Sequence, residues 1–202
     1  MAATEPLADA EPAGSDELWK AWETLDVPPG FRAEIIRGDI VLSPSPTNRH
    51  SLICTEIMRQ LWPLADERDW RLANELGVRI ESTGEVLIPD LMALPVAVLT
   101  DGEETSAIDS PELLLAVEVT SDSSVSRDRE TKLWSYAAGL VPVYMMVDRH
   151  DRNGTVRVFS EPSGEGRYQH YDLFDFGKPV RLPEPFNVEI DTSLFAPRTR
   201  RA

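Results

Sequence analysis

Residues 111–121, PELLLAVEVTS, form an apolar run into which one acid, Glu118, is set. An unbroken apolar run of this kind predicts a central β-strand that is covered on both faces. A second strand candidate, residues 85–95 (EVLIPDLMALP), contains Asp90 directly after Pro89. A carboxylate in a buried strand costs on the order of a few kcal/mol unless it is paired, hydrogen-bonded or metal-bound. Asp90 and Glu118 therefore need partners, and they can meet only if their strands are neighbours.

The segments before these strands predict a helix, a hairpin and a second helix. Residues 15–25 have apolar side chains at helical spacing, namely Leu18, Trp22 and Leu25. Residues 31–44 predict two short strands joined by a turn at residues 37–39. Residues 48–62 predict an amphipathic helix, with Pro63 marking its end or a kink. The apolar face expected for this helix comprises Leu52, Ile53, Ile57 and Leu61.

The remaining segments complete an α/β pattern. Residues 70–82 and 85–95 predict two strands separated at residues 82–84, and residues 100–111 predict a polar, acidic loop. Residues 121–138 predict a helix that Gly139 ends, and residues 141–151 a second buried strand. The C-terminal part predicts short edge strands and turns. This order of elements predicts an α/β domain whose mixed central sheet is flanked by helices.

Composition limits the protein class. The 202 residues and a hydrophobic share of 42% predict one domain, over residues 15–197, between a disordered acidic leader (1–14) and a basic tail (198–202). No apolar run is long enough to span a membrane. The single cysteine, Cys54, predicts a reducing cytoplasm, and we expect it to be buried rather than nucleophilic. A net charge of −15 counts against strong non-specific binding of DNA.

A divalent cation offers one solution for the two buried acids. Mg²⁺ is commonly bound by one or two carboxylates and keeps several waters, which leaves positions for a phosphate. A metal held by Asp90 and Glu118 would activate water for hydrolysis. The alternatives are structural, since Asp90 can begin a turn after Pro89 and Glu118 can pair with a core arginine.

Several ordered motifs resemble one known family. The segments "IPDLM" (88–92), "LAVEVTSDS" (115–123) and "RETKLWSYAAGLVPVYMMVD" (129–148) are similar to the Uma-type family of restriction-endonuclease-like proteins. The upstream segment "AEIIRGDIVLSPSPTNRHS" (33–51) also matches, so the resemblance runs over about residues 31–148. That family belongs to the PD-(D/E)XK nuclease superfamily. The resemblance implies a restriction-endonuclease-like fold, Mg²⁺- or Mn²⁺-dependent cleavage of DNA and, by analogy with the superfamily, a homodimer.

The resemblance assigns roles to individual residues. Asp90 takes the place of the Asp in the PD half-motif and Glu118 that of the first acid in the E-x-K half-motif. Both would hold the metal, assisted by the backbone carbonyl of Val119. The third position of the half-motif is Thr120, which cannot supply the charge of the usual lysine. Lys132, on the following helix, is the expected replacement, because the family also has a lysine there.

Supporting residues follow from the same resemblance, each with a structural alternative. Asp128, Lys132 and Tyr136 recur at i, i+4 and i+8 and so share a helical face. The alternative is an exposed Asp128–Lys132 pair, worth about a few tenths of a kcal/mol. Glu34 would complete the metal shell, or is an exposed acid of an edge strand. His50 would orient a phosphate or a water, or is a capping or surface histidine.

Two functions from different classes remain open. The first is a metal-dependent endonuclease in which Asp90, Glu118 and Lys132 are catalytic. The second is a catalytically silent member of the fold that acts as a binding or regulatory module, which Thr120 and the acidic charge favour. No glycine-rich phosphate loop, nucleophile elbow or dinucleotide fingerprint supports a kinase, a serine hydrolase or a Rossmann enzyme.

Overall fold

The computed structural model describes residues 15–101, 104–121 and 127–196, without the side chains of Ser15 and residues 127–129. The leader and the basic tail expected from the sequence lie outside the described residues. The first half of the chain contains α1 (Ser15–Glu23), β1 (Phe31–Ile36), β2 (Asp39–Pro44), α2 (Asn48–Glu67), β3 (Trp70–Ala73), β4 (Gly77–Ile80), β5 (Glu85–Leu87), β6 (Leu91–Pro95) and α3 (Ala97–Thr100).

The second half is richer in long strands. It contains β7 (Ala107–Asp109), a short 3-10 turn η1 (Ser110–Glu112), β8 (Leu115–Val119), the π-helical segment η2 (Arg127–Lys132), α4 (Leu133–Ala138), β9 (Val143–Asp148), β10 (Thr155–Pro162), β11 (Tyr168–Asp175), β12 (Val180–Leu182) and β13 (Val188–Ile190). None of the helices in the described ranges is long and apolar enough to cross a membrane.

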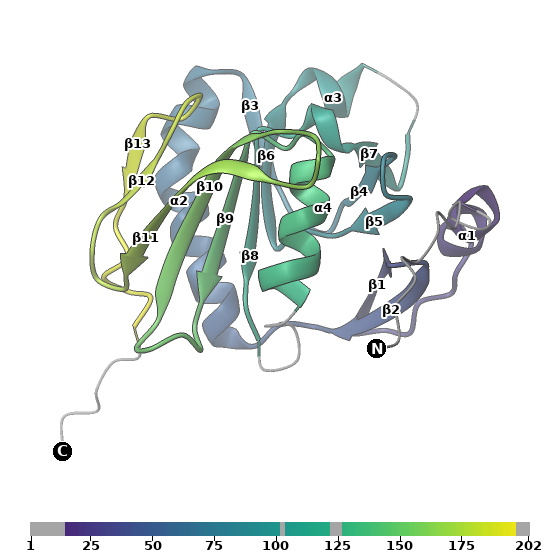
Figure 1. The fold of residues 1–202 in the computed structure, drawn as a ribbon, viewed down its shortest axis with the longest axis horizontal. Coiled ribbons are helices and arrows are strands. Elements are labelled where there is room, and N and C mark those ends of the chain that lie inside the picture. Colours follow the sequence, from purple (N-terminus) through teal and green to yellow (C-terminus); the bar gives the residue numbers. More distant parts are fainter. Residues whose placement is uncertain (1–14, 102–103, 122–126, 197–202) are drawn as a thin grey trace, which may run out of the picture.

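Two sheets form the framework (Figure 1). The larger has the strand order β11-β10-β9-β8-β6-β3, and the smaller has the order β2-β1-β5-β4-β7. β8 pairs in parallel with β9 and antiparallel with β6, and all five of its residues are buried. The sheet is therefore mixed and β8 is one of its central strands, as the sequence predicted.

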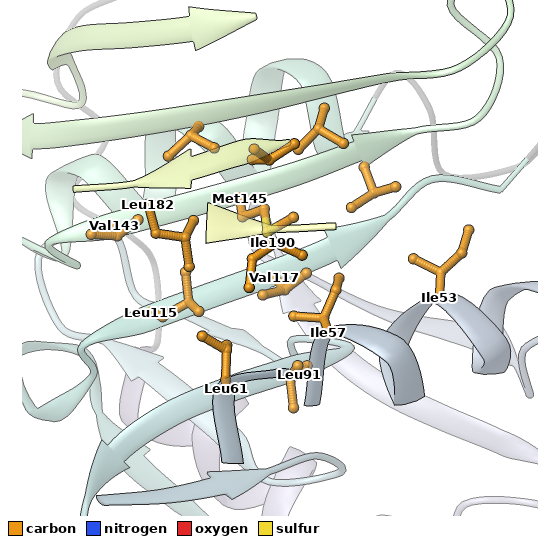
Figure 2. Close-up of a cluster of buried hydrophobic side chains, with 14 of the residues drawn as sticks. Ile53, Ile57, Leu61, Leu91, Leu115, Val117, Val143, Met145, Leu182 and Ile190 are labelled. Atoms are coloured by element: carbon orange, nitrogen blue, oxygen red, sulfur yellow. The ribbon is translucent and has the colours of Figure 1, made fainter. Parts of the chain in front are cut away.

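Helix α2 covers one face of the larger sheet. Thr47 caps its N-terminus by accepting a hydrogen bond from the backbone N–H of His50. Ile53, Ile57 and Leu61 point from it into a cluster with strand residues and with the β12–β13 hairpin (Figure 2). The expected face was wrong at Leu52, which is 39% exposed because it lies one position outside the i, i+4 row of buried residues.

Helix α4 lies between the two sheets (Figure 1). Its Tyr136 is fully buried and packs in one cluster with Met92 and Tyr144 of the larger sheet and Ile80 of the smaller one. Alternation along β8 places Ala116 and Glu118 on this face and Val117 on the α2 face. Glu118 therefore points into the space between the two sheets, where η2 and α4 begin.

Several boundaries differ from the sequence-based expectation. Residues 70–82 and 85–95 each form two strands that belong to different sheets, with breaks at Glu75, whose φ is 61°, and around Pro89, which has no N–H. The acidic loop contains β7 and η1, and β10 is a long interior strand. α2 continues through Pro63 to Glu67, because its buried row extends to Ala65.

Candidate active site

The strands that carry the two acids are hydrogen-bonded neighbours. β6 pairs with β8 so that Leu91 lies opposite Val117, and the N–H of Asp90 donates to the carbonyl of Val117 at 3.0 Å. Continuing this antiparallel register by one residue brings Asp90 opposite Glu118. Both acids are buried, with relative exposures of 8% and 1%. The expectation that the two strands lie side by side is confirmed.

Asp90 is held by three donors. Its Oδ1 accepts from Arg32 at 2.7 Å, and its Oδ2 lies 2.8 Å from Nε2 of His50 and 2.8 Å from the backbone N of Val119. Burial alone would raise the pKa of Asp90. The hydrogen bond with His50 and the charge of Arg32 outweigh burial and lower this pKa to about 2. Asp90 is therefore an anion at neutral pH.

Arg32 is the site residue that sequence reasoning missed. It lies on β1 two residues before Glu34, and alternate residues of a strand share a face. This spacing was the available signal, because any acid-bearing face of a buried strand needs a cation. Arg32 pairs with Asp90, and Lys132 pairs with Glu118. The sequence-based alternative of a core arginine paired with Glu118 stays a prediction, because the side chains of residues 127–129 lie outside the described residues.

Lys132 lies between two carboxylates. Its Nζ is 2.8 Å from Oε1 of Glu34 and 2.8 Å from Oε1 of Glu118, and the residue is only 2% exposed. The alternative of an exposed surface lysine is therefore wrong. The side chain of Asp128 lies outside the described residues, so its expected place on this helical face stays a prediction.

Glu34 belongs to the interior of the smaller sheet. β1 lies between β2 and β5, and Glu34 is 1% exposed, so the alternative of an exposed edge-strand acid is wrong. Its Oε1 also accepts the backbone N–H of Ile88 at 2.8 Å, just upstream of Asp90. Glu34 thereby connects β1, the segment before β6 and Lys132.

Tyr136 completes the contacts around Glu118. Its hydroxyl donates to Oε1 of Glu118 at 2.8 Å, the same oxygen that Lys132 contacts. Burial and the negative charge of Glu118 raise the pKa of Tyr136 well above its ordinary value. The phenol consequently stays protonated and acts as a donor.

Thr120 takes no part in these contacts. It is fully buried, and its hydroxyl donates to Oδ1 of Asp148 at 3.4 Å and accepts from the N–H of Arg149 at 3.1 Å. Asp148 also accepts the backbone N–H groups of His150 and Asp151, which stabilises the turn after β9. Thr120 thus ties the ends of β8 and β9 together and supplies no charge near Glu118.

His50 links the acids to a cavity. It is 7% exposed and bonded to Asp90, so the surface alternative is wrong. The cavity next to it has a volume of about 460 Å³. Cys54, whose Sγ lies 3.8 Å from Nδ1 of His50, also lines it. Burial is the main cause that raises the pKa of this thiol to about 12, which agrees with the expectation of an unreactive cysteine.

The residues present could hold a divalent cation only at a site with few protein ligands. No group of three or more His, Cys, Asp or Glu side chains in the described parts of the chain is arranged to hold an ion. An ionised carboxylate has about four acceptor positions, and Asp90 uses three of them. Among the described side chains, the three buried carboxylates of Glu34, Asp90 and Glu118 lie near the cations of Arg32 and Lys132. Two carboxylates completed by water match the hard oxygen ligands of Mg²⁺.

The fold resembles that of a crystallised protein described as a "putative nuclease belonging to DUF820" from Anabaena variabilis ATCC 29413. The TM-score is 0.66 at 19% sequence identity, and the match covers 90% of this chain and 96% of the other. The architecture is therefore a restriction-endonuclease-like α/β fold. A comparison with curated proteins gave no match.

A family model places the chain more narrowly. The model for Uma2, described as "Putative restriction endonuclease", matches residues 17–194. The protein therefore belongs to the Uma2 family, and the resemblance found in the sequence is confirmed.

Proposed function

We propose that this protein is a Mg²⁺- or Mn²⁺-dependent endonuclease that hydrolyses phosphodiester bonds in DNA. Membership of the Uma2 family supports a nuclease and a nucleic-acid substrate. The observation that carries the proposal is the contact of Lys132 with Glu118 at 2.8 Å. It provides an ammonium beside the second acid, where Thr120 leaves the half-motif without one.

Asp90 and Glu118, with the backbone carbonyl of Val119, would hold the ion. When bound, the ion lowers the pKa of water and offsets the charge that develops on phosphorus. The donors around Asp90 fix its carboxylate on the strand end, and Tyr136 fixes that of Glu118. Such positioning lets the acids act without reorganising during the reaction.

Lys132 would orient the attacking water. Its ammonium lies 2.8 Å from Glu34 and 2.8 Å from Glu118, which fixes it beside the second acid. Arg32 and His50 lie on the cavity side of Asp90, where they would face the substrate phosphate. Lys132 would thus position the water, and Arg32 and His50 would position the phosphate.

Cleavage assays test this assignment. Supercoiled plasmid and single-stranded DNA are incubated with Mg²⁺, Mn²⁺ or EDTA and with wild type, Asp90→Asn or Glu118→Gln. The expected result is cleavage that needs metal and falls at least about 100-fold in both variants, as for loss of one metal ligand. Glu161→Gln, at an exposed acid, is the matched control and should cleave like wild type. Activity that survives both site substitutions overturns the proposal.

A silent binding module is the second candidate. It is favoured by the three donors on Asp90 and by the absence, within the described ranges, of a three-ligand metal group. In this case Arg32 and His50 would stabilise a structural acid. Wild-type protein that cleaves neither DNA form with either metal would favour the module.

We also propose a cytoplasmic homodimer, by analogy with dimeric members of the nuclease superfamily. Sedimentation equilibrium of the full chain tests the assembly. A mass of two chains supports the dimer, and a mass of one chain excludes it.

A further inference from the structure

The cavity beside Asp90 has two chemically different parts. Arg32, His50 and Asp90 form a charged wall that adjoins the acids. The other lining side chains include the acid Glu75 and otherwise are apolar or uncharged, among them Phe31 and Asn74. At about 460 Å³ the cavity has the size of a small-molecule site. It is large enough for one nucleotide and too small for a duplex.

The charged wall suits a phosphate. Arg32 donates through one terminal nitrogen to Asp90, but its buried Nε has no partner among the described residues. Its side chain is 28% exposed, and the residue lines the cavity. Close by, α2 begins without an acidic residue in its first turn. A guanidinium with an unpartnered Nε, beside a helix N-terminus that has no acidic side chain in its first turn, favours an anion.

Another part of the cavity lining suits a base. Phe31, at the start of β1, is 47% exposed although it is a large aromatic side chain. An exposed aromatic side chain at a binding site can stack on an unpaired base. Such stacking does not depend on the nucleotide sequence, because every base has a π-face. Asn74 lines the same cavity and offers an amide for the edge of a base.

The net charge of the chain favours binding of single-stranded nucleic acid over binding of a duplex. A duplex is held by many phosphate contacts over a broad basic surface, and a net charge of −15 disfavours such contacts. A single nucleotide inserted into the cavity needs only the local cations. The acidic charge that weakens duplex binding therefore still permits a single nucleotide to bind in the cavity.

We propose that the cavity binds one unpaired nucleotide, with its phosphate at Arg32 and His50 and its base on Phe31, so that the substrate is single-stranded nucleic acid. This proposal rests on the proposed nuclease function, because it places the nucleotide next to Asp90. It specifies the substrate class of that site, which the sequence left open.

Fluorescence anisotropy of the full chain tests it. A short labelled single strand and the same strand in a duplex are titrated in EDTA, so that no cleavage is needed. Single strand should bind about tenfold more tightly than duplex, and Phe31→Ala should weaken single-strand binding about tenfold, as for loss of one stacked base. Trp62→Ala is the matched control, since Trp62 is 49% exposed and lies outside the cavity lining.

Competition experiments distinguish recognition of the base from recognition of the phosphate alone. A deoxynucleoside monophosphate should displace the labelled strand at a lower concentration than inorganic phosphate does. Equal affinity for the two DNA forms, equal effects of the two substitutions, equal competition, or no measurable binding each overturns the proposal. Failure of the nuclease function would instead appear as absence of cleavage, which this measurement does not use.

Discussion

Replacing Lys132 by methionine removes a buried charge from between two carboxylates. Methionine has a similar length but no charge, and the Nζ that it replaces lies 2.8 Å from both Glu34 and Glu118. Glu34 and Glu118 then lose the ammonium that lies between them. Removing one partner of a buried ion pair costs about 3–5 kcal/mol. With a urea m-value of about 2 kcal/mol per molar, the unfolding midpoint should fall by about 2 M.

Urea unfolding followed by far-ultraviolet circular dichroism measures this change. Lys178→Met, at an exposed lysine, is the matched control and should leave the midpoint unchanged. Adding Glu34→Gln to Lys132→Met should recover part of the loss, because it removes one of the two carboxylates that Lys132 contacts. A loss below about 1 kcal/mol for Lys132→Met would refute the reasoning, since that is the value of an exposed pair.

Three further outcomes are expected. Because the folded-state pKa of Asp90 is lowered to about 2, its ionisation stabilises the fold above pH 4, and this contribution disappears as pH falls toward 2. The difference in unfolding free energy between wild type and Asp90→Asn should thus shrink by about 2 kcal/mol over that window, and a constant difference would contradict it. Tyr136→Phe should lower the unfolding free energy by about 2 kcal/mol through loss of the hydrogen bond to Glu118, which an unchanged urea midpoint would disprove. Cys54, with its pKa near 12, should react with iodoacetamide at pH 8 about 100-fold or more slowly in the folded than in the urea-unfolded protein; equal rates would show an accessible thiolate.

The sequence predicted secondary structure correctly in segments that follow a single hydrophobic pattern. The apolar run around Glu118 predicted a central strand, and the β1–β2 hairpin followed from the turn at residues 37–39. The proximity of Asp90 and Glu118 was expected because each acid was costly in isolation. Local patterns and desolvation cost were therefore sufficient to predict the central part of the fold.

The same local patterns did not predict which strands and side chains pair over long sequence separations. Nothing local shows that residues 77–80 join a different sheet from residues 70–73, because the break at Glu75 is a backbone conformation and not a composition signal. Arg32 comes to Asp90 from 58 residues away. η2 is π-helical, so regular α spacing did not describe how Lys132 reaches Glu118. These features depend on tertiary packing, which a single sequence does not contain.

The central claim is that Asp90 and Glu118 hold a divalent cation, and calorimetric titration of Mn²⁺ tests it most directly. Wild type and Glu161→Gln should bind the ion alike, whereas Asp90→Asn and Glu118→Gln should each bind it at least about tenfold more weakly. Circular dichroism of each variant shows that the fold is retained. Absence of binding to wild type at millimolar Mn²⁺, or equal binding by all four proteins, would contradict the account.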